Sequence, residues 1–325
     1  MEKSEKIETQ KVQDENIIEW CNLIENSNNG TIFDHPSFIS YHKNKFRIER
    51  LLFKKNKSVI AGISFDLNLL EKEKILKSPF GASYGGIIFL TKCKLLTYIE
   101  VYKSLIDYSK DIGVKKIYFT QIPDSYTFEK QNYNSFALKL NNFVLDKSLL
   151  TMGTELFNFD DSKVSRRKKR YIKKHEKEGI IENKEVDYSE LEKFYLILKH
   201  NRNKFNVVPT HTLDELKEIF NSNNKNVKLY LSYVNKKIAS GALVFHLTDK
   251  LANVFYLCHD EEFEKFRPSL SLALFIQKKY ITFGFEYLDF GPSSFDDFSL
   301  NIGGIKFKED IGCVGFCRDS WIKKL

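Results

Sequence analysis

The sequence predicts an α/β protein built from two similar halves, each a mixed, twisted β-sheet flanked by helices. Two observations support this prediction. One order of elements, namely a β-hairpin, a strand, a helix, a glycine and a further strand, occurs twice along the chain. The length of 325 residues corresponds to about two domains, and a chain of this size buries enough apolar surface to fold without a metal or disulfide.

The first half contains five predicted elements. They are a helix over 15–25, a β-hairpin over 47–67, a strand over 81–89, a helix over 95–112 and a strand over 114–123. Asn56 and Lys57 stand at the hairpin turn, where short β-hairpins favour residues that tolerate positive φ. Gly113 follows the second helix and is a typical helix stop.

The second half repeats this order after two predicted helices. Its elements are helices over 188–203 and 212–221, a β-hairpin over 228–247, a strand over 251–258, a helix over 269–283 and a strand over 285–292. Asn235 and Lys236 stand at the second turn, 179 residues after Asn56 and Lys57. The shared order of elements indicates an internal duplication.

Positive charge is concentrated in one segment. The chain has 51 Lys and Arg against 43 Asp and Glu, a net charge of +8, and residues 163–178 alone contribute +7. Ser165 is a good N-cap and Gly179 a good stop, so we expect a basic helix of about 13 residues. Its predicted exposed face includes Arg166, Arg170 and Lys173. The helix is either a solvated surface helix or a binding face for RNA, a phosphate-bearing donor or acidic lipid head groups.

Five short stretches of the second half follow one another in a characteristic order. They are 169–174 with Gly179 and Ile180, 239–241, 266–269 with Leu272, 288–293, and 307–309 with Gly312. In this order and spacing they resemble the Fem-type (FemAB-like) transferases of the GNAT superfamily and their acyl-CoA-using relatives in bacterial polysaccharide biosynthesis.

The resemblance implies two tandem GNAT-like domains after a flexible segment over 1–12. The first domain, 13–160, would lie on the acceptor side. It would be degenerate, because its second helix begins without an Arg-Pro-Ser sequence. The second domain, 161–325, would lie on the donor side and open with the basic helix.

Three functions fit these features. The leading one, implied by the resemblance, is an N-acyltransferase that uses acyl-CoA and acts on an amine of a cell-envelope precursor such as an amino sugar. The alternative within the family is an aminoacyl-tRNA-dependent transferase acting on a peptidoglycan precursor, which the basic helix favours. A non-catalytic scaffold that binds RNA or a membrane surface is the rival of another class.

The start of the helix over 269–283 is the predicted donor-phosphate site. Free backbone N–H groups at a helix N-terminus attract anions, and Arg267 adds charge. The resemblance implies that Arg267, Ser269 and Ser271 bind the donor here. Pro268 and Ser269 stand where the GNAT pattern has glycines, so ordinary helix punctuation is the other interpretation.

Three residues of the second half are candidates for catalysis. Asp289 ends a strand, where it would orient or deprotonate the acceptor amine or else cap the following loop. Lys308 matches a family lysine that meets a donor or acceptor phosphate, and is otherwise a strand-surface lysine. His246 flanks the strands that bind the acyl group in GNAT domains, where it would be a base or a hydrogen-bonded polar residue.

Candidate substrate-binding residues come from both halves. In the first half, Phe33, Tyr84 and Gly85 belong to stretches similar to the aromatic-glycine loop that relatives carry at the acceptor cleft between domains. A turn followed by a strand weakened by glycine is the other interpretation. In the second half, Tyr256 and Ser293 lie beside the predicted donor strands.

The remaining composition limits the setting of the protein. Five scattered cysteines and a charged N-terminal stretch predict a reducing cytoplasm, or the inner membrane surface if the acceptor is lipid-linked. The longest apolar stretches are far shorter than the ~20 residues that a membrane span needs. No Cys and His spacing suggests zinc, so no metal is expected.

Overall fold

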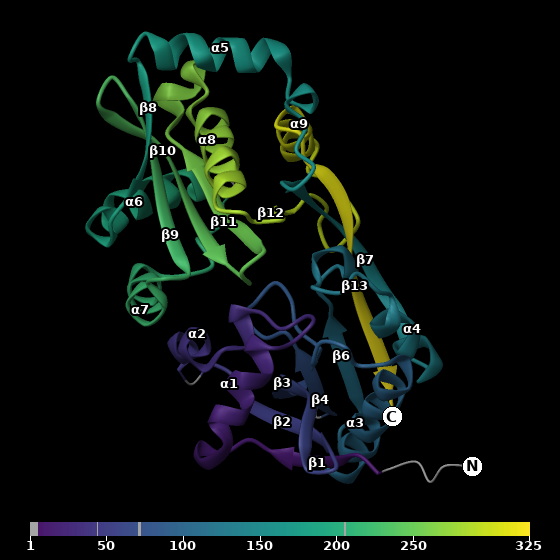
Figure 1. The fold of residues 1–325 in the computed structure, drawn as a ribbon. Helices are drawn as coiled ribbons and strands as arrows, with labels where there is room; N and C mark the ends of the chain where they lie inside the picture. Colours follow the sequence, from purple (N-terminus) through teal and green to yellow (C-terminus); the bar gives the residue numbers. More distant parts are fainter. Residues whose placement is uncertain (1–5, 44, 71–72, 205) are drawn as a thin grey trace. The chain divides into compact units, whose positions relative to one another are not determined.

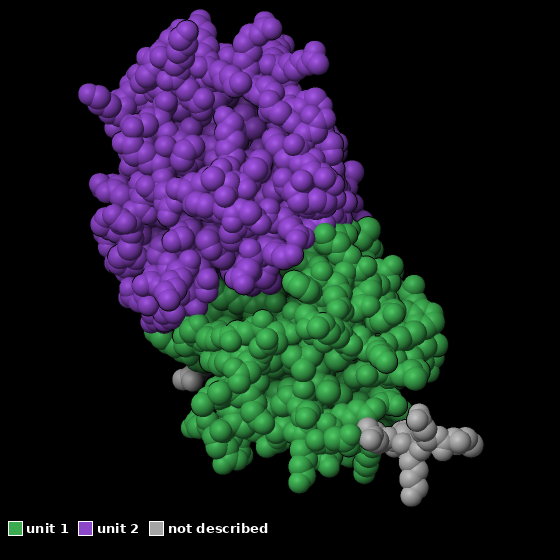
Figure 2. Space-filling view, viewed as in Figure 1, with its two compact units in different colours: residues 1–148, 317–325 green, residues 149–316 purple. Residues whose placement is uncertain are grey.

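The computed structural model describes residues 6–43, 45–70, 73–204 and 206–325. The chain forms two compact units (Figures 1 and 2): unit 1 contains residues 1–148 and 317–325, and unit 2 contains residues 149–316. These bounds differ from the expected domain boundary at 160/161. The reason is that two long strands, β7 (Val144–Glu155) and β13 (Val314–Lys324), each contribute residues to both units.

The expected flexible segment over 1–12 is wrong for part of its length. Residues Glu8–Lys11 form strand β1, which pairs antiparallel with the strand that opens the first hairpin. Residues 1–5 of that segment lie outside the described residues. No helix among the described residues is long and apolar enough to cross a membrane.

Unit 1 is built on a sheet of strand order β1-β2-β3-β4-β6-β13. Its other elements are α1 (Ile17–Glu25), α2 (Pro36–Ile39), β2 (Ile48–Lys55), β3 (Ser58–Leu70), β4 (Glu73–Ser78), β5 (Ile87–Phe89), α3 (Leu95–Asp111), β6 (Lys116–Thr120) and α4 (Tyr133–Leu140). The strand expected over 81–89 is limited to β5, which pairs with β3. The largest core of the unit joins α3 to the sheet, as its apolar periodicity predicts.

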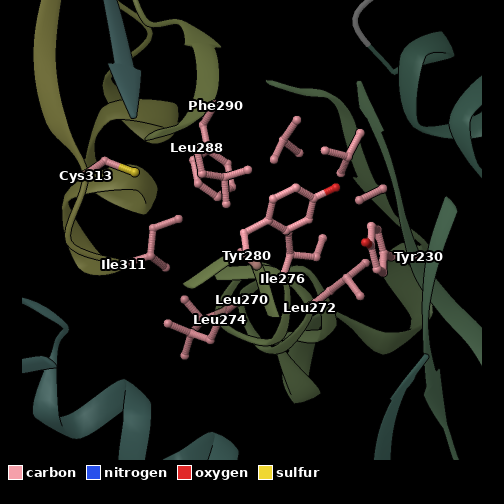
Figure 3. Close-up of a cluster of buried hydrophobic side chains, with 14 of the residues drawn as sticks. Tyr230, Leu270, Leu272, Leu274, Ile276, Tyr280, Leu288, Phe290, Ile311 and Cys313 are labelled. Carbon is pink, nitrogen blue, oxygen red and sulfur yellow. The ribbon is translucent and has the colours of Figure 1, made fainter. Parts of the chain in front are cut away.

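Unit 2 is built on a sheet of strand order β7-β12-β11-β10-β9-β8. Its other elements are α5 (Arg166–Lys177), β8 (Ile181–Val186), α6 (Leu191–Asn203), α7 (Leu213–Asn223), β9 (Val227–Val234), β10 (Lys237–His246), β11 (Leu251–His259), α8 (Pro268–Thr282), β12 (Tyr287–Pro292) and α9 (Ile302–Asp310). Figure 3 shows α8 side chains such as Leu272, Ile276 and Tyr280 gathered with Tyr230 and Leu288 of the strands in one core.

The two hairpins have the same turn geometry. Each turn has an Asn followed by a Lys, both with positive φ: 51° and 66° at Asn56 and Lys57, and 49° and 66° at Asn235 and Lys236. Two consecutive residues with positive φ define the hairpin turn whose twist suits the flanking strands. The turns predicted from the sequence are confirmed.

A glycine in each hairpin lies under a helix. A Cβ on Gly62 would come within 2.6 Å of Leu23 in α1, and one on Gly241 within 2.5 Å of Phe194 in α6. Both contacts are too short for a real side chain, so only glycine permits this packing. Each unit therefore repeats the same helix-on-hairpin arrangement, which explains the matching position of the two glycines in the sequence.

Candidate functional site

Two neighbouring strands of unit 2 stop pairing partway along their length, and we call this interval the split. The parallel strands β11 and β12 pair only over Leu251–Asn253 and Tyr287–Asp289, although both continue beyond these residues. The first turn of α8 lies at the open end, because the Ser269 hydroxyl is 3.0 Å from that of Ser240, which pairs with the last residue of β11. The split therefore has a helix N-terminus at its mouth.

Asp289 lies at the last paired position of β12, where the split begins. Its side chain is fully buried, and its Oδ1 accepts hydrogen bonds from the Thr151 hydroxyl and the Gly291 backbone N–H, both at 2.9 Å. Its Oδ2 accepts from Asn253 Nδ2 at 3.0 Å. The carboxylate thus links β7, β12 and β11 and stabilises the turn after the strand, as expected for a loop cap.

Lys308 lies on a helix, α9, and not on a strand surface. Its side chain is buried, and Nζ donates to the carbonyl oxygens of Gly291 (2.8 Å) and Pro292 (2.9 Å) and to the Ser293 hydroxyl (2.9 Å). Burial lowers the pKa of Lys308 to about 8, while the nearby Asp289 carboxylate acts in the opposite direction. The structure therefore brings three predicted site residues, Asp289, Lys308 and Ser293, into one cluster.

The mouth of the split offers fewer anion contacts than the sequence predicts. Pro268 has no N–H, and those of Leu270 and Ser271 are donated to the carbonyl oxygen of Arg267. Among the described residues this leaves the Ser269 N–H without a partner. The Arg267 side chain is exposed, with its guanidinium carbon 5.5 Å from the ring centre of Tyr171.

The Ser271 side chain, unlike that of Arg267, is buried inside the unit. Its hydroxyl is fully buried, accepts a hydrogen bond from Asn183 Nδ2 at 2.8 Å and donates to Glu176 at 3.2 Å. It joins α8 to α5 and β8 inside the unit. Of the predicted donor residues, the structure brings Arg267 and Ser269 together at the mouth.

His246 lies on the closed side of the split. It pairs with Ala252 of β11, and its Nε2 is 2.7 Å from the Tyr280 hydroxyl near the end of α8. Burial, supported by the charge of Lys228, lowers the pKa of His246 to about 4. The structure does not bring His246 to the Lys308 cluster.

Tyr256 lies on β11 beyond the segment that pairs with β12, and it is buried. Its hydroxyl accepts the backbone N–H of His211 at 3.1 Å and lies 2.9 Å from His211 Nδ1. A histidine just before an N-capping Thr212 gives no sign that its ring reaches a strand.

The basic helix α5 begins and ends where the sequence predicts, after Ser165 and before Gly179. Of its basic side chains, three form ion pairs and three others were predicted to share an exposed face. Lys168, Lys169 and Lys174 form ion pairs with Asp310, Asp161 and Glu178. By contrast, Arg166, Arg170 and Lys173 are exposed and make no ion pair with the described residues. These three form the free cationic face of α5.

Unit 1 has a separate recess that includes two predicted substrate residues, Tyr84 and Gly85, together with Asp34. Asp34 is buried, and its Oδ2 accepts from the backbone N–H and hydroxyl of Thr31. Burial raises the pKa of Asp34 to about 7. Phe33 is also buried, with its ring against that of Phe38.

In unit 1 the strands that correspond to β11 and β12 are β4 and β6. A loop of the chain itself occupies the interval beyond their paired residues. Strands β4 and β6 pair in parallel, and the loop 79–86 continues along β6. In this loop the Gly85 N–H donates to the carbonyl oxygen of Thr120 at 2.9 Å, and the Gly86 N–H donates to the Ser78 hydroxyl at 2.9 Å. This loop takes the place that the split occupies in unit 2.

No protein-family model matches this chain, and no curated protein is similar to it in sequence. Solved structures are similar in fold. FemX superposes with a TM-score of 0.72 at 14% identity over 97% of both chains. The C-terminal domain of a putative lysylphosphatidylglycerol synthetase from Agrobacterium fabrum gives 0.60 at 12% identity, over 96% of this chain and 92% of that one. A tandem GNAT protein from the clavulanic acid biosynthesis pathway gives 0.55 at 8% identity over 98% of both chains.

These similarities confirm the fold that the sequence predicts. The chain has the tandem GNAT fold, of the Fem-like kind seen in FemX. Within this fold the split pair β11 and β12, with α8 at its mouth, is the feature of unit 2 on which a function can be argued.

Proposed function

We propose that the chain is an N-acyltransferase that binds its acyl donor in the split between β11 and β12. The observation that carries this proposal is the combination of a split strand pair with a helix N-terminus at its mouth and a buried ammonium, that of Lys308, beside it. Acyl-CoA is the preferred donor. Its phosphates would meet the Ser269 N–H and Arg267, and its acyl group would extend into the split.

The reaction needs little from the protein besides position and charge. The acceptor amine attacks the acyl carbon, a C–N bond forms, the C–S bond of the donor breaks, and the amine loses a proton to water. Negative charge develops on the carbonyl oxygen and then on the leaving sulfur. A fixed positive charge at Lys308 stabilises both in a water-poor site. Asp289 is buried behind the loop, so we assign it to shaping the site.

His246 has a different role in this proposal. Its position on the closed side and its contact with Tyr280 support a packing role in the core of unit 2. Tyr256 of β11 and Ser293, the residue that follows β12, are the proposed acceptor contacts. The acceptor we propose is an amine of a cell-envelope precursor such as an amino sugar. A lipid-linked precursor would place the reaction at the inner membrane surface.

Unit 1 is proposed to bind no donor. Its own loop 79–86 is hydrogen-bonded along β6, and α3 begins after Lys94 without a side-chain cap. Tyr84 and Gly85 stay the proposed acceptor contacts of this unit. The recess beside Asp34 has no room for a water-sized molecule, so the Asp34 carboxyl group is not assigned to the acceptor.

Aminoacyl-tRNA is a second candidate donor, favoured by α5. Arg166, Arg170 and Lys173 follow one another at one-turn spacing on the free cationic face, which suits successive phosphates of a nucleic acid. The face contains no apolar side chain that would enter a membrane. Helix α5 lies beside the α8 N-terminus, since Arg267 approaches Tyr171 and the Ser271 hydroxyl donates to Glu176, so one donor would be able to contact both.

The test is a transfer assay with purified protein. Acetyl-CoA is mixed with a panel of amino sugars, free thiol is followed with a colorimetric reagent, and products are identified by mass spectrometry. Thiol release that depends on an amino sugar, with an acetylated product, supports the proposal. Product formation only with aminoacyl-tRNA would replace the donor, and none with either would contradict the proposed activity.

A further inference from the structure

We infer that Asn253 and Thr151 are positioning residues of the Lys308 site. They hold Asp289, and Asp289 holds the bend of β12 whose oxygen atoms surround the Lys308 ammonium. The inference rests on the proposed function only in treating Lys308 as part of a reaction site. The contacts themselves are independent of that function.

The bend is a β-bulge in β12. Asp289 pairs with Gly153 of β7, whereas Pro292 pairs with Thr151, so β12 has one residue more than its partner over this interval. Gly291 takes a φ of 75° inside the bulge, a conformation that favours glycine. The Asp289 carboxylate accepts the Gly291 N–H across the bulge and so stabilises its shape.

The carboxylate is held from both neighbouring strands. Thr151 of β7 donates its hydroxyl to one oxygen, and the Asn253 carboxamide of β11 donates to the other. Exposure of the three side chains is 1%, 3% and 0% for Thr151, Asn253 and Asp289. A buried carboxylate needs such donors, because loss of water without replacement strongly disfavours the charge.

The bulge determines where the Lys308 ammonium lies. Two of its three acceptors are the carbonyl oxygens of Gly291 and Pro292, and the third is the hydroxyl of Ser293, the next residue. An ammonium has three protons, and each has one acceptor here. If Asp289 loses a donor, the bulge relaxes, the carbonyls turn away and the ammonium loses its fixed position.

The experiment measures the stability of the bulge and the chemical reactivity of Lys308, and it needs no enzymatic turnover. Hydrogen exchange read by mass spectrometry follows the peptide that contains Gly291, and competitive trace acetylation with acetic anhydride follows the reactivity of Lys308. The variants are Thr151→Val and Asn253→Leu. Thr151→Ser keeps the hydroxyl and should restore the wild-type values. Ser232→Ala, which changes another fully buried polar side chain of the same sheet, controls for general loosening.

We expect Thr151→Val and Asn253→Leu each to raise exchange at Gly291 and labelling of Lys308 about tenfold, the effect of losing one buried hydrogen bond. Thr151→Ser and Ser232→Ala should change neither. Unchanged exchange and labelling in both folded variants would overturn the inference. So would an equal rise across all peptides of unit 2, since that shows unfolding. A wild-type protein without transfer activity would instead contradict the proposed function and leave these two measurements valid.

Discussion

The ammonium nitrogen of Lys308 lies 2.8 Å from the carbonyl oxygen of Gly291. This contact joins the last turn of α9 to the bulge of β12, at the side of the split where the acyl group of a donor would lie. It places a buried positive charge next to a gap between strands, with two backbone carbonyl oxygens and the Ser293 hydroxyl as its acceptors.

Removing the positive charge of Lys308 should abolish most of the proposed acyl transfer. Lys308→Ala is expected to lower turnover by roughly 10²-fold, the range seen when one group that stabilises developing negative charge is removed. Lys306→Ala, an exposed lysine on the same helix, should keep full turnover. Steady-state thiol release measures both, and circular dichroism checks that each variant is folded. Equal turnover in the two variants would remove Lys308 from the site.

The reaction should lose rate at alkaline pH. With a pKa of about 8, Lys308 is charged below this pH and becomes neutral above it. Turnover is therefore expected to fall as the pH rises through 8. In Lys308→Arg the fall should disappear below about pH 10, because a guanidinium stays protonated. The measurement is turnover from pH 6 to pH 10, with enzyme stability checked at each pH. A fall that persists unchanged in Lys308→Arg would assign the titration to another group.

Variants of the free cationic face of α5 should show whether tRNA binds there, and so distinguish an aminoacyl-tRNA donor from acyl-CoA. Changing Arg166, Arg170 and Lys173 together to Glu is expected to weaken binding of labelled tRNA at least tenfold and to flatten its salt dependence, if tRNA is the donor. Fluorescence anisotropy at several salt concentrations measures both effects. A matched control changes three exposed lysines at and along α3, namely Lys94, Lys103 and Lys110. Equal weakening in the control would indicate unspecific charge attraction.

Ionisation of Asp34 should lower the free energy of unfolding of unit 1 as the pH rises. Burial raises its pKa from 3.8 to about 7, so the folded state holds this proton more tightly than the unfolded state. This stabilisation is fully present below pH 4. As the pH rises through 7 it is lost, and the free energy of unfolding falls by roughly 4 kcal/mol. Asp34→Asn carries no titrating group and should remove this slope. Urea unfolding at pH 4, 5.5 and 8 compares the two proteins, and parallel slopes would show that Asp34 is not the source.

Local sequence signals predicted much of the fold. The order of the elements and the two Asn-Lys turns indicated the duplication, because the chemistry of a turn depends on few neighbours. The segment around Lys308 was harder to interpret. Helix α9 contains Gly303 and Gly304 in its first turn, which weakens the helical signal, so a strand remained open as an alternative.

The candidate site was predicted in part. Asp289 and Ser293 were identified from the stretch 288–293 and Lys308 from the stretch 307–309, whereas Thr151 and Asn253 were missed. Asn253 is a polar residue inside a largely apolar strand, which was an available sign of a buried hydrogen bond, whereas the strand of Thr151 contains several other polar residues. Their common partner, however, lies more than 30 residues away in sequence, and only the sheet order brings the three strands together.

The most direct test of the account is isothermal titration of the protein with acetyl-CoA. The account predicts a micromolar Kd and about tenfold weaker binding to Arg267→Asn, which removes the charge but suits the φ of 55° at this position. Lys278→Asn, at an exposed position on the same helix, should bind like the wild type. No binding at millimolar acetyl-CoA would contradict a coenzyme A donor in the split of unit 2.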